Sequence, residues 1–139
     1  GRPPQLSELI SAATLQQLFD WTDRVHLPRA VADYIARLVD ATHADSEHSD
    51  EHVRKYVRFG ASPRAALALA ATARGAALLA GKPNAGFQEV QRVAPSVLGH
   101  RLILDYAARL DGWTPLTMAE HLVDSVAHVA DNVPEDVEV

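Results

Sequence analysis

The chain has 139 residues, 47% of them hydrophobic, which is enough for one domain with a buried core. Its 13 basic and 18 acidic residues give a formal net charge of −5, the wrong sign for binding nucleic-acid phosphates. The lack of cysteine excludes disulfides, thiolate metal sites and a cysteine nucleophile. No apolar run approaches the roughly 20 residues that cross a bilayer, and no signal-peptide pattern opens the chain. We therefore expect a cytoplasmic protein with no membrane or nucleic-acid partner.

The composition favours an all-α fold. Only eight residues are aromatic (two Trp, three Tyr and three Phe), so aliphatic residues and alanine must fill the core, which suits closely packed helices. Hydrophobic periodicity predicts a compact bundle of five or six helices over residues 11–131. Residues 1–10 are expected to form a linker or entry segment, and residues 132–139 an acidic tail.

Two helices are predicted before residue 43. Ser11 is a candidate N-cap for the first helix, and Pro28 suits the first turn of the second. The apolar or small side chains expected to face the core are Leu15, Leu18, Phe19, Thr22 and Val25 in the first helix, and Val31, Tyr34, Ile35, Leu38, Val39 and Thr42 in the second.

Residues 43–52, HADSEHSDEH, are expected to form a solvated loop because they are rich in acid and histidine. His43, His48 and His52 could together capture a divalent metal, but nothing in the sequence supplies the supporting contacts of a built site. We therefore predict no metal site. No role is predicted for the remaining histidines, which are His26, His100, His121 and His128.

The central helix is expected to begin at Ser62-Pro63, after an extended segment over residues 53–59 and a turn at Gly60, and to run to about Ala80. A turn over residues 81–84 precedes a short helix over residues 87–94 that Pro95 is expected to end. Two further helical stripes are predicted, one formed by Leu102, Ile103, Tyr106 and Leu110, the other by Met118, Leu122, Val126 and Val129.

The sequence contains none of the common self-contained catalytic signatures. The segment GKPNAG over residues 81–86 is not a phosphate-binding loop, because no Ser or Thr follows Lys82 and no strand precedes it. Arg64 is the chemically unusual residue, because a cation in the first turn of a helix is disfavoured by the positive potential of the free N–H groups. That combination suits a phosphate, although an arginine that simply faces solvent remains an alternative.

The segment Phe59 to Leu69, FGASPRAALAL, resembles the GASPRA signature that opens the central lid helix of MoxR-family AAA+ ATPases. The resemblance continues through residues 11–43 and 73–104. It implies that Arg64 is the sensor 2 arginine, which reaches the terminal phosphates of ATP in a companion core domain. It also implies ATP and Mg²⁺ as cofactors of the parent ATPase, with neither bound tightly by this chain alone.

By the same resemblance, we expect a lid domain that has no catalytic residue of its own and is not an enzyme in isolation. Its expected partners are the AAA+ core domain, neighbouring subunits of a hexamer and von Willebrand A domain proteins, in a chaperone-like role in complex assembly or maturation. Two alternatives are a free-standing helical protein-interaction module and a metal-binding regulator that uses the histidine loop.

Overall fold

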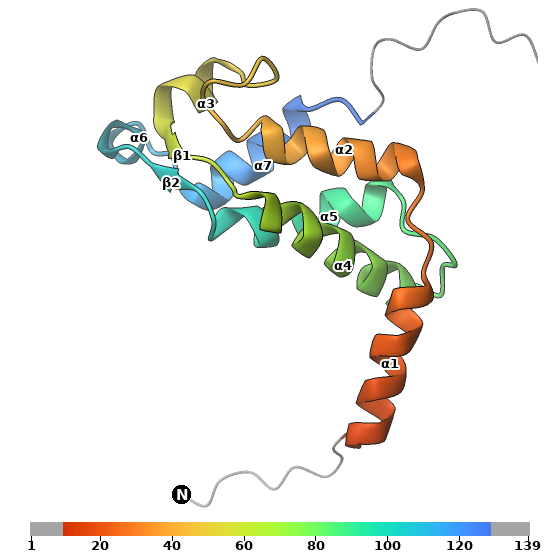
Figure 1. Ribbon diagram of the computed structural model, residues 1–139. Helices are drawn as coiled ribbons and strands as arrows, with labels where there is room; N and C mark the ends of the chain where they lie inside the picture. Colours follow the sequence, from red (N-terminus) through yellow and green to blue (C-terminus); the bar gives the residue numbers. More distant parts are fainter. Residues whose placement is uncertain (1–9, 129–139) are drawn as a thin grey trace, which may run out of the picture.

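The computed structural model describes residues 10–128, which form seven helices and one two-stranded sheet (Figure 1). The elements in chain order are α1 (Ala12–Arg24), α2 (Arg29–Asp40), α3 (Glu51–Tyr56), β1 (Val57–Phe59), α4 (Pro63–Leu79), α5 (Phe87–Gly99), β2 (Ile103–Leu104), α6 (Tyr106–Leu110) and α7 (Pro115–Ser125). The predicted helical fold is confirmed. Within the described residues, no helix combines the length and the apolar character that crossing a membrane requires. The acidic tail, Val129 and the linker before Ile10 lie outside those residues.

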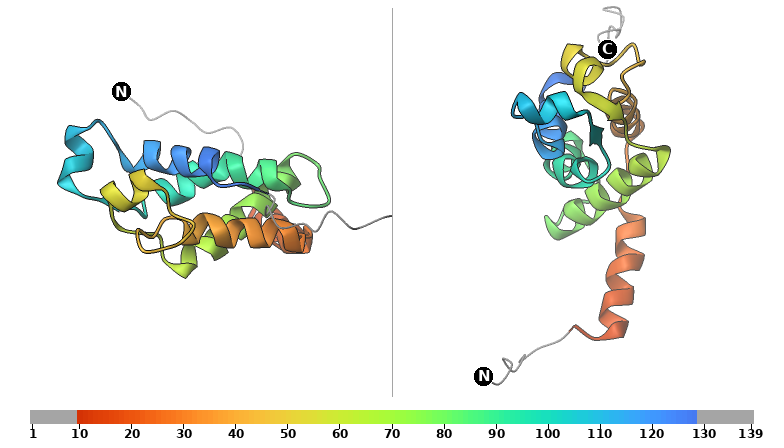
Figure 2. Two further views of the ribbon diagram at one scale, coloured as in Figure 1. Left: turned by 90° about the horizontal axis from the view of Figure 1, so that it is seen from above. Right: turned by 90° about the vertical axis from the view of Figure 1, so that its left-hand side faces the viewer.

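Helix α4 packs against α1, α2 and α5, and α5 in turn packs against α7 (Figures 1 and 2). The buried residues of α4 are Ala65, Leu69, Ala73 and Ala77, which recur every four positions and so form one stripe. Because three of the four are alanines, the neighbouring helices can approach closely. The prediction of a small-residue helix that begins after Ser62 and ends near Ala80 is confirmed.

Helix α2 carries the apolar stripe that its sequence predicts. Its buried residues are Val31, Tyr34, Ile35, Leu38 and Val39, and Thr42 just after the helix is fully buried. The ring of Tyr34 meets that of Phe87 edge to face at 5.7 Å, which joins α2 to the start of α5.

Helix α1 does not bury the stripe that its sequence predicts. Ser11 does cap it, since its hydroxyl accepts a hydrogen bond from the Thr14 N–H at 3.1 Å, but no residue of the helix is buried. Phe19, for example, is 56% exposed. One end of the helix meets α4 and the rest projects away from the other helices (Figure 1), and the chain enters the core only at Val25, just after it.

Pro95 does not end α5, contrary to the sequence prediction, and the helix continues to Gly99. A proline inside a helix removes one backbone hydrogen bond and crowds the preceding turn. Here the residues on both sides of it, Ala94, Val97 and Leu98, are buried in the core where α5 packs against α4 and α7. The burial of these side chains outweighs the local penalty.

The region around the two-stranded sheet also differs from prediction. Residues 51–56 form a helix, and only the next three residues are extended. Strand β1 pairs antiparallel with β2, with Val57 opposite Leu104. The helical stripe predicted from Leu102 to Leu110 is therefore wrong, because β2 occupies its first half, while Tyr106 and Leu110 in α6 are 74% and 71% exposed.

The turn between α4 and α5 is fixed by Glu89, whose side chain is 6% exposed. One carboxylate oxygen accepts a hydrogen bond from Lys82 Nζ at 2.7 Å, and the other accepts from the backbone N–H of Gly86 at 2.9 Å. The Lys82 ammonium, followed by the Gly86 N–H, lowers the pKa of Glu89 below its ordinary value.

We predict that Glu89→Gln destabilises the chain by about 1–2 kcal/mol near neutral pH, because the amide keeps the contact with Gly86 but loses the ion pair with Lys82. A lowered pKa in the folded protein means that the contribution is present above the ordinary pKa of glutamate and disappears as the pH falls through the lowered value. Urea unfolding across this range should therefore show the difference from wild type shrinking in acid. The exposed Glu120→Gln is the matched control. A pH-independent difference would contradict the prediction.

Candidate functional site

Arg64 lies in the first turn of α4 and is exposed. Ser62 is the N-cap residue with an extended backbone, and Pro63 occupies the first helical position, as predicted. The Ser62 side chain does not bond the helix N-terminus. Among residues 10–128, no carboxylate forms an ion pair with Arg64. The first turn of α4 therefore carries an exposed arginine that no described carboxylate neutralises.

The segment just before α4 is held by the end of α2. The Ala61 N–H donates to the hydroxyl of Thr42 at 2.9 Å, and His43 Nε2 donates to the Ala61 carbonyl oxygen at 2.9 Å. The Thr42 hydroxyl donates in turn to the Val39 carbonyl oxygen at 2.6 Å. Thr42 and Ala61 are fully buried, so these bonds are shielded from water. We call this set of contacts, made by Thr42 and His43 to Ala61, the α2–α4 clamp.

Gly60 is required by the clamp for a steric reason. A Cβ atom at this position would lie 2.7 Å from both the carbonyl oxygen and the hydroxyl of Thr42, and 2.8 Å from Nδ1 of His43. These separations are shorter than any relaxed contact, and one of the obstacles is backbone. Gly60 thus allows close approach, Ala61 is fully buried, and Pro63 occupies the first helical position. Arg64, the fifth residue of the signature, is left exposed.

This arrangement can bind an anion. The N-terminus of a helix presents backbone donors and a partial positive charge, and a guanidinium adds a planar fork of donors that matches phosphate oxygens. Because the clamp fixes the start of α4, the backbone that carries Arg64 is positioned before any ligand arrives.

The histidines of the predicted loop do not come together. His43 belongs to the clamp, whereas His48 bonds the Asp40 carboxylate through Nδ1 at 2.8 Å. His52 instead lies beside Asp50 and beside His121 of α7. No sequence signal links residues 52 and 121, so the proximity of His121 to His52 was not predictable. Asp50 is the N-cap of α3, and its side chain accepts a hydrogen bond from the Val53 N–H. Since aspartate is a preferred N-cap residue, this role could have been identified from the sequence.

Lys82, in the segment GKPNAG, is committed to Glu89 as described above. The same segment pairs with the connection between α1 and α2: the His26 N–H donates to the Pro83 carbonyl oxygen at 3.1 Å, and the Ala85 N–H to the His26 carbonyl oxygen at 2.9 Å. These contacts give the segment a structural task.

Comparison with known proteins agrees with the helical arrangement and with the signature at α4. The sequence profile of the AAA lid domain family matches residues 49–125. The chain belongs to this family and is the helical lid domain of an AAA+ protein.

The chain is also similar to two longer proteins. The chain is 36% identical over 125 residues to the Chaperone MoxR1 of Mycobacterium tuberculosis, a match that covers 90% of this chain and 33% of that protein. It also resembles the crystal structure of a Cytophaga hutchinsonii protein assigned as an ATPase, with a TM-score of 0.73 and 29% identity over 78% of this chain and 33% of the other. The chain thus spans about one third of the length of both proteins.

We predict that Gly60→Ala destabilises the chain by about 1–3 kcal/mol, because the added methyl group must displace Thr42 or His43 and disrupt the clamp. Gly75→Ala in the middle of α4 is the matched control, since a Cβ there meets no atom within 4 Å. It should be neutral or stabilise the helix by about 0.5–1 kcal/mol. Denaturant unfolding of both variants measures the difference. Equal stability of the two would show that the clamp is not as tight as described.

Proposed function

We propose that this chain is the nucleotide-sensing lid of a MoxR-type AAA+ ATPase, in which Arg64 binds the terminal phosphates of ATP held by the core domain and couples nucleotide state to lid position. The observation that carries the proposal is an exposed guanidinium with no carboxylate partner among residues 10–128, on a helix whose start is fixed by buried hydrogen bonds. A cation kept free in this way is available for a ligand from another domain.

The chain by itself supplies only a small part of a nucleotide site. It offers one arginine and the start of one helix, and its segment GKPNAG is used structurally. We therefore propose that ATP and Mg²⁺ bind to the parent protein, that hydrolysis needs the core domain, and that the isolated chain binds nucleotide weakly at most. A chaperone-like role in assembling or maturing protein complexes is supported by the similarity to Chaperone MoxR1.

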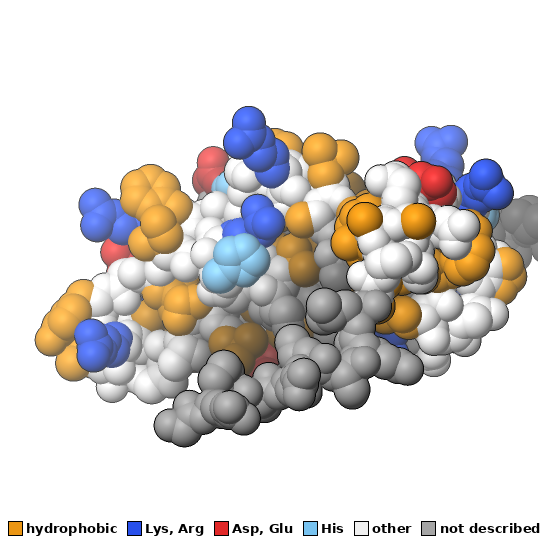
Figure 3. Space-filling view, turned by 90° about the horizontal axis from the view of Figure 1, so that it is seen from below, with side chains coloured by type: hydrophobic (Ala, Val, Ile, Leu, Met, Phe, Trp, Pro, Cys, Tyr) orange, Lys and Arg blue, Asp and Glu red, His pale blue; other side chains and the backbone are white. Residues whose placement is uncertain are grey.

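Exposed apolar side chains on α4 and on α1 support a contact with another domain. Leu67 lies three residues after Arg64, on the same side of α4, and is 73% exposed. Phe19 and Trp21 of α1 are 56% and 50% exposed. Figure 3 looks at the side from which α1 projects and shows hydrophobic side chains at several places on this side. We propose that α1 and the exposed side of α4 contact the core domain or a neighbouring subunit of a hexameric ring.

Arg64→Ala tests the sensor role directly. In the full-length ATPase we predict at least a tenfold fall in the rate of hydrolysis, since a charge-assisted contact to phosphate is worth about 1.5–3 kcal/mol. Arg64→Lys should recover little of the rate, because an ammonium lacks the planar fork of donors. The melting temperature of the 139-residue chain should not change in either variant, because Arg64 is exposed and lies outside the clamp.

The chain contains its own matched control for this experiment. Arg29 also follows a proline at the start of a helix, and the sequences LPRA and SPRA differ only in their first residue. The side chain of Arg29 is 95% exposed, but α2 and α4 begin at opposite ends of the helix pair (Figure 1). Arg29→Ala should leave the rate of hydrolysis unchanged. Equal effects of Arg29→Ala and Arg64→Ala would reject the sensor assignment.

Phe19→Asp tests the contact made by α1. We predict at least tenfold weaker assembly of the full-length protein, measured by sedimentation, because a buried aromatic contact would be replaced by a charge that must lose its hydration. The exposed Gln16→Asp on the same helix is the control. Since no residue of α1 is buried, the melting temperature of the isolated chain should be the same for both variants. Unchanged assembly of Phe19→Asp would exclude this part of α1 from the interface.

A further inference from the structure

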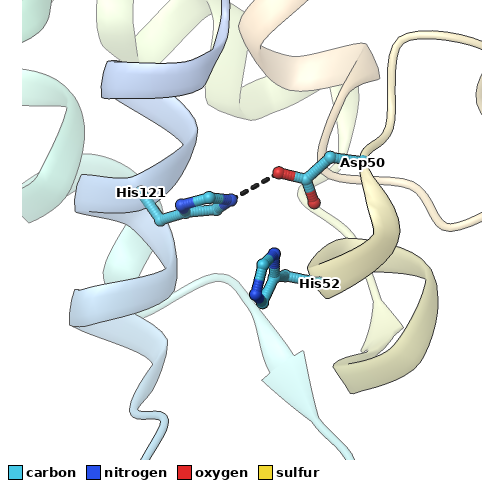
Figure 4. Close-up of side chains that lie close together, drawn as sticks. All are labelled: Asp50, His52 and His121. Carbon is cyan, nitrogen blue, oxygen red and sulfur yellow. Dashed lines mark hydrogen bonds and ion pairs between the residues drawn. The ribbon is translucent and has the colours of Figure 1, made fainter.

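Three potential metal ligands converge beside α3, away from the clamp. Asp50 and His52 come from the start of α3, and His121 comes from the middle of α7 (Figure 4). Each offers one ligand atom, and the three atoms lie within 4.8 Å of one another. Asp50 Oδ2 is in direct contact with His121 Nε2. The three side chains therefore meet from segments that are about half the chain apart.

The surroundings hold these ligands in place. Asp50 caps α3, and its Oδ1 accepts from the Val53 N–H at 2.9 Å, which orients Oδ2 toward the histidines. The His52 ring lies 5.1 Å from the ring of Trp113, which in turn lies 5.5 Å from that of His121. The side chains of Asp50 and His121 are 31% and 27% exposed, so both are largely shielded. Because these side chains are already ordered, binding a metal ion would cost little further side-chain entropy, which favours binding.

The ligand set selects one class of ion. Two imidazole nitrogens and one carboxylate oxygen are typical of Zn²⁺ sites with three protein ligands and a fourth position for water. Mg²⁺ and Ca²⁺ need six or more oxygen ligands, which one carboxylate and two imidazoles do not supply. His52 also lines a surface depression with Glu51, Lys55 and Tyr56, which gives a hydrated ion a route to the site.

We propose that Asp50, His52 and His121 form a binding site for Zn²⁺ or a similar divalent transition metal, which fastens α3 to α7. Of the three loop histidines considered from the sequence, His43, His48 and His52, only His52 belongs to this set. The bound ion would link the start of α3 to α7, which packs on α5, so it would stabilise the folded chain. The site does not depend on Arg64 or on nucleotide.

The test is titration of the tag-free, chelator-treated chain with Zn²⁺ by calorimetry and with Co²⁺ by visible absorption, near neutral pH. We expect one ion per chain, the intense visible bands of four-coordinate Co²⁺, and a higher melting temperature with Zn²⁺. His52→Ala and His121→Ala should each weaken binding at least about 100-fold. Asp50→Asn should weaken it at least about tenfold while keeping the cap, because asparagine caps helices as well as aspartate does.

His48→Ala is the matched control, because His48 belongs to the same loop but bonds Asp40 instead of the proposed site. It should bind Zn²⁺ as tightly as wild type. Far-UV circular dichroism checks folding, and His52→Ala remains informative if His121→Ala unfolds, since it leaves the contact between Asp50 and His121 in place. Failure of the wild-type chain to bind one ion, or equal binding by wild type and His52→Ala, would overturn the proposal. So would loss of binding in His48→Ala.

Discussion

The hydrogen bond from the Ala61 N–H to the buried hydroxyl of Thr42 holds the segment just before α4 against the end of α2. It is supported by the bond from His43 to the Ala61 carbonyl oxygen, so both polar backbone atoms of Ala61 are satisfied by the end of α2. A buried residue with unsatisfied backbone atoms would cost several kcal/mol, which gives these bonds their structural weight. The position of α4 relative to α2 follows from them, and α4 in turn supports α5.

The same arrangement separates the residues that build the site from the residue proposed to act in it. Thr42, Gly60 and Ala61 are needed for packing, whereas Arg64 makes no ion pair within residues 10–128 and is exposed. Stability and the proposed nucleotide sensing should therefore respond to different substitutions. An exposed cation at a helix N-terminus has a small local cost, and we attribute its presence to a phosphate on another domain.

Much of the fold was predictable because several segments carry strong local signals. The stripe of α2 and the Ser62-Pro63 start of α4 are of this kind, and both are confirmed. The failures arise where tertiary contacts outweigh local preference. Burial of Ala94 and Leu98 carries α5 past Pro95, and pairing of β2 with β1 replaces an expected helical turn.

The apolar positions of α1 have helical spacing but remain exposed, because periodicity alone does not show which surface a helix packs against. The candidate site was also predictable only in part: Arg64 could be singled out from the sequence, but the contacts that position it could not. Arg64 stood out by its position in the helix, and the resemblance to a lid signature added its proposed role. The clamp was not predictable, since nothing in the sequence pairs Thr42 with Ala61. Nor was the meeting of His52 with His121, which depends on how α3 and α7 pack.

The central claim is that Arg64 contacts the terminal phosphate of ATP in the intact protein. The most direct measurement is a structure of the full-length protein with a non-hydrolysable ATP analogue and Mg²⁺. We expect the Arg64 guanidinium within about 3 Å of an oxygen of the terminal phosphate, with the α2–α4 clamp unchanged. An occupied nucleotide site in which Arg64 still faces solvent in every subunit would contradict the account.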